Sequence, residues 1–311
     1  MPLPRVIVHD LPEPVGETLL RGSVEILPWE LALRGETNAE GIYMFGHERI
    51  DGPLMDRLPA LKVISNCGVG VDHIDVVAAK ERGIKVGNTP GVLDETVADI
   101  AFALLLMAAR RLGEGVRYAR SEAFTEVKHN TMLGRDAHHA TLGIVGLGSI
   151  GAQIAKRARA FDMEILYHNR SRNPAAEAAY GAQYVTLDEL LAESDYVMLM
   201  VPLTEKTRGL INAKTLAKMK RTATLINMSR GPVVDTAALT KKMQAKRIYH
   251  AALDVTDPEP LPRDHPLLSM DNVTITPHLG SATVQTRLKM AEISTENLLR
   301  GLRGEELVHE V

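Results

Sequence analysis

The amino-acid sequence predicts an α/β protein made of two doubly wound domains, each built on a parallel β-sheet. The first observation is that short apolar or β-branched runs alternate with helical stretches along the whole 311-residue chain. The second is that several of these runs are apolar at consecutive positions, as expected of parallel strands covered by helices on both faces. The third is the length, because about 150 residues per domain gives two domains.

The first series of runs predicts the sheet of an N-terminal domain, over roughly residues 1 to 90. Its predicted strands are Val6–Val8, Val24–Leu27, Ile42–Phe45 and Leu61–Ser65. The stretch Val92–Leu112 follows, apolar on nearly every face and with Asp94 in position to cap its N-terminus. A helix that is apolar all round is buried, so we expect this one to lie between domains or between subunits.

The second series begins after Ser121–His139, a polar and poorly patterned stretch that predicts an arm or loop. Its predicted strands are Thr141–Val145, Met163–Tyr167, Tyr196–Met200, Ala223–Asn227, Ala251–Val255 and Val273–Ile275, with helical periodicity between them, as in Ala152–Phe161 and Thr236–Lys246. The final stretch, Ala282–Leu302, is again helical and is expected to pack on the first sheet. The second domain, residues 99–279, is therefore predicted to be inserted into a first domain made of residues 1–98 and 280–311.

Composition excludes several classes of function. With 36 Lys and Arg against 39 Asp and Glu, the chain lacks the basic excess of a nonspecific nucleic-acid binder. Its single Cys excludes an intramolecular disulfide and a Cys-based zinc site, and no metal site is expected. Residues Met1–Arg5 do not resemble the start of a secretory signal, and the longest apolar run, Ala101–Ala109, is too short to span a bilayer. We therefore expect a cytoplasmic protein that binds neither nucleic acid nor membrane.

A glycine-rich turn joins the predicted strand Thr141–Val145 to the predicted helix behind it. The turn reads Gly146-Leu147-Gly148-Ser149-Ile150-Gly151, the G-x-G-x-x-G pattern. The first Gly permits the tight turn, the second lets the backbone approach a pyrophosphate, and the third allows close helix–strand packing. The N–H groups of the helix N-terminus then bind the phosphates. This context predicts a dinucleotide site, with a plain strand–helix turn as the alternative.

The end of the next strand bears on the choice of cofactor. About 20 residues after the first Gly, a carboxylate would bind the ribose 2′-hydroxyl of NAD. The sequence there is His168-Asn169-Arg170-Ser171-Arg172, which has no carboxylate and two arginines. Arginine can bind a 2′-phosphate through several N–H donors. We predict that NADP(H) is preferred and that NAD(H) is a possible second cofactor; the alternative is a solvated turn carrying two surface arginines.

Three polar residues follow apolar runs in the second half of the chain. Arg230 follows a predicted strand and precedes Gly231, Glu259 lies in the segment Asp254–Pro260, and His278 lies in the segment Thr276–Thr283. In an open α/β sheet, ligands bind at the carboxyl ends of the strands, so these side chains could converge beside a nicotinamide. Taken singly, each could instead be a surface Arg, a turn Glu and a capping His.

Taken together, these segments resemble the D-2-hydroxyacid dehydrogenase family. The resemblance rests on Gly146–Gly151, Asn227–Gly231, Asp254–Pro260 and Thr276–Thr283, and in the first half on Ser65–Asp75 and Gly87–Leu93. Within the family the sequence is most similar to the glyoxylate/hydroxypyruvate reductase branch. The resemblance implies two Rossmann-like domains, one for substrate and an inserted one for cofactor, and a homodimer built on the cofactor domains.

The resemblance also assigns catalytic roles. Arg230 would bind the carboxylate of a 2-oxo acid and polarise its keto oxygen. His278 would be the general acid in reduction, and Glu259 would hydrogen-bond its other ring nitrogen and favour the protonated ring. The backbone N–H groups of Val69 and Gly70 would hold the substrate carboxylate. Asp254 would accept a hydrogen bond from the nicotinamide carboxamide. Further cofactor contacts are expected at Thr96, Pro202 and Gly280, besides the glycine turn and residues 169–172.

The predicted function is therefore an NADPH-preferring reductase of small 2-oxo acids to D-2-hydroxy acids. Glyoxylate and hydroxypyruvate are the favoured substrates, with 2-ketogluconate next. The alternative is a dinucleotide-sensing transcriptional corepressor on the same scaffold. Such an NADH-linked sensor should keep an acidic ribose contact, which the segment 168–172 lacks.

Overall fold

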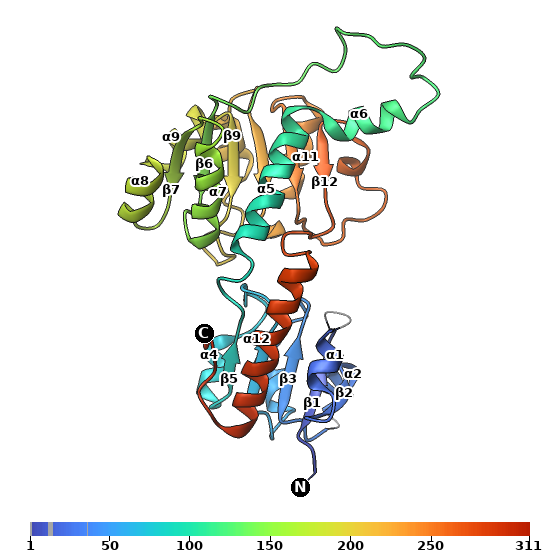
Figure 1. The fold of residues 1–311 in the computed structure, drawn as a ribbon, viewed down its shortest axis with the longest axis vertical. Helices are drawn as coiled ribbons and strands as arrows, with labels where there is room; N and C mark the ends of the chain where they lie inside the picture. Colours follow the sequence, from blue (N-terminus) through green and yellow to red (C-terminus); the bar gives the residue numbers. More distant parts are fainter. Residues whose placement is uncertain (1, 12–14, 36) are drawn as a thin grey trace. The chain divides into compact units, whose positions relative to one another are not determined.

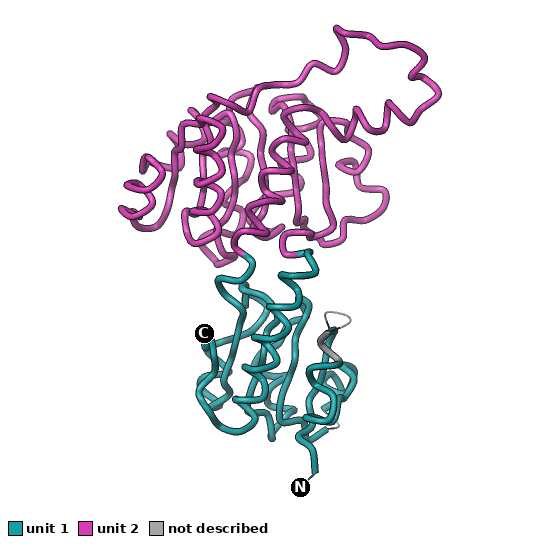
Figure 2. The backbone as a smooth tube through the Cα atoms, in the orientation of Figure 1, with its two compact units in different colours: residues 1–93, 282–311 teal, residues 94–281 magenta. Residues whose placement is uncertain are grey.

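The computed structural model describes residues 2–11, 15–35 and 37–311, which form two compact units (Figures 1 and 2). Unit 1 comprises Met1–Leu93 and Ala282–Val311, and unit 2 comprises Asp94–Ser281. Unit 2 is thus inserted in sequence between the two parts of unit 1. Both units are α/β with a parallel sheet, which confirms the predicted fold class.

Unit 1 contains a five-stranded sheet in the order β2-β1-β3-β4-β5, and every pairing is parallel. Its strands are β1 (Arg5–Val8), β2 (Glu25–Pro28), β3 (Gly41–Met44), β4 (Val63–Asn66) and β5 (Lys85–Gly87). Its helices are α1 (Val15–Leu20), α2 (Glu30–Arg34), α3 (Gly52–Asp56), α4 (Val76–Glu81) and α12 (Val284–Arg303). Helix α12 packs across β3, β4 and β5, as predicted for Ala282–Leu302 (Figure 1).

Unit 2 contains a seven-stranded sheet in the order β12-β11-β10-β9-β6-β7-β8, again with parallel pairings. Its strands are β6 (Thr141–Val145), β7 (Glu164–His168), β8 (Gln183–Tyr184), β9 (Tyr196–Leu199), β10 (Thr224–Asn227), β11 (His250–Leu253) and β12 (Val273–Ile275). Its helices are α5 (Asp94–Ala109), α6 (Leu112–Ala119), α7 (Ser149–Arg159), α8 (Pro174–Tyr180), α9 (Leu187–Glu193), α10 (Ala213–Lys218) and α11 (Thr236–Gln244), with 3₁₀ turns η1 (Gly231–Val233) and η2 (Pro266–Ser269). The strand order reverses between β6 and β9, which is where ligands bind in open α/β sheets.

Helix α5 corrects the prediction of one helix from Val92 to Leu112. It ends at Ala109, and Arg111 adopts a left-handed conformation with φ +52°, which interrupts the helical hydrogen bonds before α6 begins. The Arg111 guanidinium is held by Glu114, with Nε 2.8 Å from a carboxylate oxygen. The domain boundary predicted after residue 98 would cut α5, whereas the whole helix belongs to unit 2 and packs on α7, β10 and β11.

The stretch between Arg120 and Ala140 forms the predicted arm. It contains no helix or strand, and Figure 1 shows it extending away from the sheet of unit 2. Within the described ranges, no helix combines enough length and apolarity to cross a lipid bilayer.

Candidate active site

The glycine turn after β6 has the geometry of a dinucleotide-binding loop. Gly146 has φ +106°, and a Cβ there would lie 2.7 Å from the carbonyl carbon of Met200, the residue that follows β9. Gly151 sits so close to the Gly146 carbonyl that a Cβ would be 2.5 Å from its oxygen. At Gly148, by contrast, nothing lies within 4 Å of a Cβ position. The turn is therefore tight on its protein side and open at Gly148, directly before the N-terminus of α7, so it fits a pyrophosphate.

Asn169 locks this turn to the end of β7. Its Oδ1 accepts a 2.6 Å hydrogen bond from the Leu147 N–H, and its Nδ2 donates to the Leu147 carbonyl at 3.2 Å. Asn173 adds a second donor to the same carbonyl at 3.0 Å. The Asn169 side chain is thus engaged with the glycine turn itself. At this position it fixes the shape of the turn beside the predicted ribose site.

The two arginines after β7 have different surroundings. Arg172 forms a bidentate pair with Glu177, with distances of 3.0 and 2.6 Å from Nε and a terminal nitrogen. Glu177 also accepts a hydrogen bond from the Tyr167 hydroxyl, and the pair with Arg172 lowers the pKa of Glu177. Among the described residues, none forms a hydrogen bond or ion pair with the exposed Arg170 side chain. Arg170 is therefore the arginine that is open to a further anion.

The three predicted catalytic residues follow three neighbouring strands. Arg230 follows β10, Glu259 follows β11 and His278 follows β12. Because all three strands are parallel, their carboxyl ends lie at one edge of the sheet, and the loops that carry these residues touch one another. A hydrogen bond from the Thr276 N–H to the Leu253 carbonyl, 2.9 Å long, joins the His278 loop to the end of β11.

Arg230 is positioned by a tight turn. The Asn227 side chain accepts from the Ser229 N–H at 3.0 Å and donates to the Arg230 carbonyl at 3.0 Å. A Cβ on Gly231 would lie 1.8 Å from the Thr256 carbonyl oxygen. Only glycine therefore lets this turn come so close to the loop that carries Glu259. The position of Arg230 therefore depends on close backbone contact between the β10 and β11 loops.

His278 and Glu259 form a hydrogen-bonded pair. The His278 Nδ1 lies 2.8 Å from Glu259 Oε1, and the side chains are 32% and 36% exposed. His278 has φ +54°, a conformation that its backbone N–H helps to hold by donating to the Asp254 carbonyl at 3.0 Å. Nδ1 is thus directed at the carboxylate, while the partial exposure gives small molecules access to the ring. This is the arrangement of an oriented acid–base histidine.

Asp254 supports the His278 loop from below. Its carboxylate is 2% exposed and accepts three hydrogen bonds, from the Thr276 hydroxyl at 2.6 Å and from the Leu279 and Gly280 N–H groups at 2.8 Å each. The carboxylate predicted to contact a nicotinamide is therefore engaged within the protein. Gly280, another predicted cofactor contact, is one of its donors.

Val69 and Gly70 lie in unit 1, in the loop after β4. Their carbonyl oxygens are tied by side-chain amides: Asn88 donates to the Val69 carbonyl at 2.9 Å and Asn66 donates to the Gly70 carbonyl at 3.0 Å. In the part of the chain that the structure describes, no acceptor is bonded to the N–H of either residue. Both N–H groups can therefore bind a carboxylate oxygen, as the resemblance implies.

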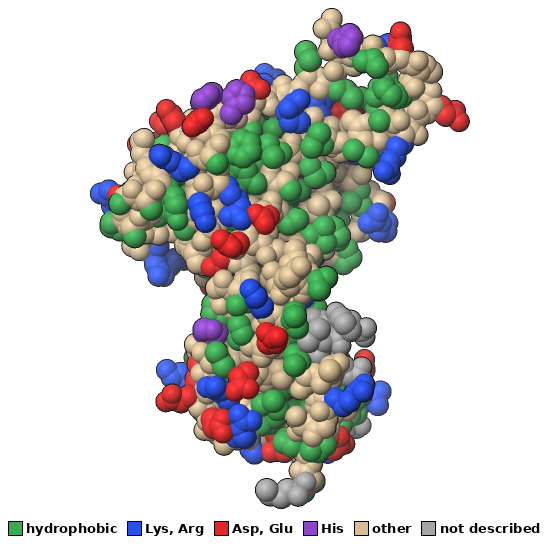
Figure 3. Space-filling model, viewed as in Figure 1, with side chains coloured by type: hydrophobic (Ala, Val, Ile, Leu, Met, Phe, Trp, Pro, Cys, Tyr) green, Lys and Arg blue, Asp and Glu red, His purple; other side chains and the backbone are tan. Residues whose placement is uncertain are grey.

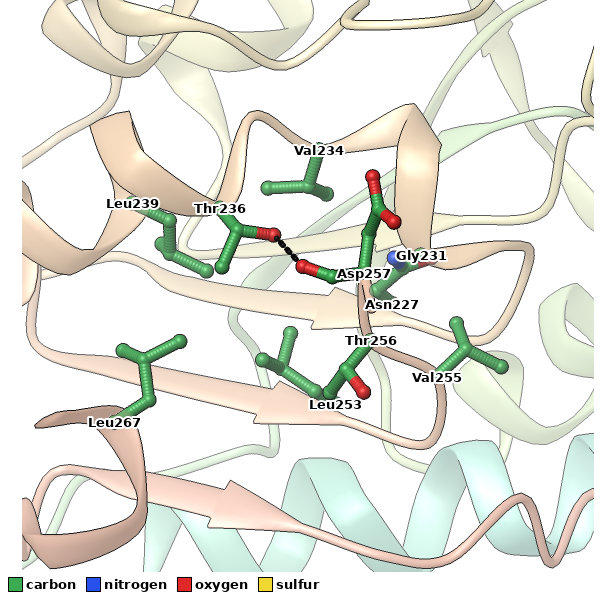
Figure 4. A pocket seen from close by; sticks show the side chains of 10 residues that line it. All are labelled: Asn227, Gly231, Val234, Thr236, Leu239, Leu253, Val255, Thr256, Asp257 and Leu267. Atoms are coloured by element: carbon green, nitrogen blue, oxygen red, sulfur yellow. Dashed lines mark hydrogen bonds between the residues drawn. The ribbon is translucent and has the colours of Figure 1, made fainter. Parts of the chain in front are cut away.

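The remaining predicted contacts lie on elements around the glycine turn. Thr96 is in the first turn of α5, Ser149 and Ile150 begin α7, Ser171 follows β7, and exposed Pro202 follows β9. Beneath the Arg230 turn is a small pocket (Figure 4), in which the Thr236 hydroxyl donates to the Asp257 carbonyl at 2.8 Å. It is lined by Asn227, Gly231, Val234, Thr236, Leu239, Leu253, Val255, Thr256, Asp257 and Leu267. This lining offers no cation for an acidic substrate.

Sequence reasoning missed the residues that hold the site in shape. These are Asn173 behind the glycine turn, Asn227 in the Arg230 turn and Thr276 beside Asp254. Their common signal is a short polar side chain at the end of a strand, directly after one, or directly before a helix. That signal is weak, because such residues also cap turns throughout α/β proteins.

Comparison with known proteins shows which protein family this chain is similar to. Residues 102–280 match the family model described as "D-isomer specific 2-hydroxyacid dehydrogenase, NAD binding domain". The chain is 49% identical over 257 residues to a glyoxylate reductase of Korarchaeum cryptofilum, covering 82% of this chain and 77% of that one. It is 45% identical over 268 residues to glyoxylate/hydroxypyruvate reductase B of Escherichia fergusonii, covering 86% and 82%.

A solved structure agrees over nearly the full length. The NADPH-dependent glyoxylate/hydroxypyruvate reductase of Sinorhizobium meliloti, in complex with NADP and malonate, superposes with a TM-score of 0.90. The two chains are 34% identical, and the match covers 99% of this chain and 96% of that one.

Proposed function

The chain belongs to the D-isomer specific 2-hydroxyacid dehydrogenase family, and on that premise we propose that it reduces glyoxylate and hydroxypyruvate to D-2-hydroxy acids with NADPH. The family membership confirms the resemblance found in the sequence, and with it a nicotinamide dinucleotide as the cofactor. We place 2-ketogluconate next among the substrates. The observation that carries the proposal is the His278–Glu259 pair, which lies in the same unit as the glycine turn.

The residues present fit the cofactor. The open side of Gly148 and the N-terminus of α7 would hold the pyrophosphate, since first-turn N–H groups have no partner within their own helix. When bound, the reduced nicotinamide supplies the hydride. Asn169 fixes the turn, and Arg170 would bind the 2′-phosphate of NADPH.

The protein's own residues supply the rest of the chemistry. His278 gives a proton to the keto oxygen from Nε2, because Nδ1 is directed at Glu259. The Glu259 carboxylate keeps the ring oriented. Arg230 binds the substrate carboxylate and polarises the carbonyl group, and the N–H groups of Val69 and Gly70 bind the carboxylate as well. Asp254 acts by holding the His278 loop in place.

A substrate panel tests this function. The purified chain is assayed with glyoxylate, hydroxypyruvate and 2-ketogluconate, each with NADPH and with NADH, and kcat/KM is compared. We expect the highest values for glyoxylate and hydroxypyruvate with NADPH. No turnover of any of the three would contradict the proposal. The corepressor alternative gains no support, because none of the relatives described above is a corepressor.

We also propose a homodimer built through the arm. Phe124, Val127 and Leu133 expose 46%, 69% and 69% of their surface, and Figure 3 shows hydrophobic side chains on the projecting arm. An arm with this surface has little to pack on within one chain, and a second copy would cover it. Sedimentation should give about twice the 34.0 kDa chain mass, and Val127→Asp with Leu133→Asp should weaken the dimer. A monomeric wild type would contradict the proposal.

A further inference from the structure

Arg287 occupies an unusual position at the start of α12. Its guanidinium carbon lies 4.7 Å from the centre of the Phe45 ring, and Phe45 directly follows β3. The Arg287 side chain is half-buried, and burial lowers the pKa of its guanidinium. The arginine is thus held on an aromatic face at the carboxyl edge of the unit 1 sheet.

No described carboxylate lies within ion-pair distance of Arg287. The titratable group that it faces is the Cys67 thiol, and burial raises the pKa of that thiol, so the thiol is neutral. Elsewhere on α12, Arg300 pairs with Glu296 at 2.6 Å and Arg303 pairs with Glu305 at 2.8 Å. A half-buried guanidinium without a counter-ion is costly, and an anionic ligand would remove that cost.

The surroundings place Arg287 near the loop of Val69 and Gly70, which is predicted to bind the substrate carboxylate. Cys67 directly follows β4, two residues before Val69, and its N–H donates to the Met44 carbonyl at 2.7 Å. Because β3 and β4 are neighbours, Phe45 and Cys67 leave the sheet at the same edge. A molecule held by the N–H groups of Val69 and Gly70 would therefore have Arg287 as a nearby cation.

We propose that Arg287 binds a second anionic group of the substrate, so that the enzyme also reduces 2-oxo acids with a carboxylate on C3. This inference rests on the proposed function and adds a substrate class to it. The chemical step is unchanged: hydride from the reduced nicotinamide adds to C2, the π electrons of the carbonyl move to oxygen, and His278 protonates that oxygen. Arg287 is a specificity residue that takes no part in hydride or proton transfer.

The experiment compares three substrates that differ at C3. In oxaloacetate C3 bears a second carboxylate, in pyruvate C3 is a methyl group, and glyoxylate has no C3. They are assayed with whichever reduced cofactor the wild type uses better. Arg287→Met keeps an unbranched, apolar side chain but loses the guanidinium and its charge, and Arg287→Lys keeps the charge. Arg300→Met, on the same helix, is the matched control.

We expect the wild type to reduce oxaloacetate with a higher kcat/KM than pyruvate. Arg287→Met should lower kcat/KM for oxaloacetate about 10- to 100-fold, mainly through KM, since a charge-assisted hydrogen bond is lost. Glyoxylate should change less than about threefold, and Arg287→Lys should retain more oxaloacetate activity than Arg287→Met. Arg300→Met should behave as the wild type.

Two results would overturn the inference. One is a wild type that reduces glyoxylate but prefers pyruvate to oxaloacetate. The other is an equal loss for oxaloacetate and glyoxylate in Arg287→Met. Either would contradict the role of Arg287 alone, whereas failure to reduce any of the three acids would contradict the proposed function as well.

Discussion

The Nδ1 atom of His278 lies 2.8 Å from Oε1 of Glu259, although 19 residues separate the two in sequence. The contact exists because β11 and β12 are adjacent parallel strands and both residues follow the strands' carboxyl ends. The contact fixes which ring nitrogen faces away from the carboxylate. The pair is thus arranged so that one nitrogen is anchored and the other can exchange a proton.

Glu259→Gln tests the charge of this pair. Glutamine can keep a hydrogen bond to Nδ1 but loses the negative charge, so a charge-assisted hydrogen bond becomes an ordinary one and the ring is held less firmly. We expect kcat to fall about 10-fold, while the cofactor binds as in the wild type. The measurement is kcat for glyoxylate in both proteins, and equal values would count against a role of the Glu259 charge in the reaction.

Arg230→Lys tests whether Arg230 binds the carboxylate of the substrate. Lysine keeps the charge but lacks the planar fork that binds a carboxylate through two N–H groups. The KM for glyoxylate should rise and kcat should fall, while cofactor affinity changes little. Steady-state kinetics and a fluorescence titration with the cofactor measure the two effects. Unchanged substrate kinetics would remove Arg230 from the proposed site.

Cofactor choice is predicted to depend on Arg170 more than on Arg172. Arg172 is occupied by Glu177, whereas Arg170 has no described partner. Arg170→Ala should therefore lower NADPH affinity about 10- to 100-fold and leave NADH affinity nearly unchanged. Arg172→Ala is the matched control and should lower NADPH affinity less than Arg170→Ala does. A wild type that uses NADH as well as NADPH would contradict the assignment, as would a larger loss in Arg172→Ala.

The sequence was sufficient to predict the strands whose apolar runs are long. Ile7, Ile42 and Ile64 are fully buried at the centre of the first sheet, as their surroundings indicated. Strands β5 and β8 were missed because Lys85–Gly87 and Gln183–Tyr184 are too short to show a pattern. The end of α5 was missed because the break at Arg111 has no Gly or Pro to mark it.

The positions of site residues were predictable where they follow from one rule, that ligands bind at the carboxyl ends of parallel strands. The hydrogen-bond partners of individual side chains were not predictable. His278 meets Glu259, and the Arg230 turn contacts the loop of Glu259, because all three residues follow the carboxyl ends of adjacent parallel strands. That Arg172 pairs with Glu177 depends on the turn into α8, and that Asp254 binds the Leu279 N–H depends on a contact across 25 residues. Such pairings follow from tertiary geometry, which residue types and spacing do not encode locally.

Buried His250 makes the stability of the protein sensitive to acid. It is 3% exposed, with Nε2 2.9 Å from the Thr274 hydroxyl. Burial, together with the nearby Arg111 charge, lowers the pKa of His250 to about 4, from 6.5 in the unfolded chain. Below pH 6.5 the unfolded state therefore binds more protons, so the free energy of unfolding decreases as the pH falls toward 4.

The size of this effect can be measured with His250→Gln, which lacks the titrating group. Between pH 7.5 and pH 5.0 the wild type should lose about 2 kcal/mol more than the variant, from the linkage of proton binding to unfolding. Urea denaturation followed by circular dichroism at the two pH values gives both numbers. Parallel losses in the two proteins would show that His250 does not carry the effect.

His278 is the proton donor in the proposed reduction of a 2-oxo acid, and the decisive measurement of this role is the kcat of His278→Asn for glyoxylate. Asparagine keeps a polar side chain but cannot act as an acid near neutral pH, so kcat should fall about 100-fold or more. The cofactor should bind to the variant as it does to the wild type, because His278 is not part of the glycine turn. A variant that binds cofactor normally and keeps a kcat within about threefold of the wild type would contradict this role of His278.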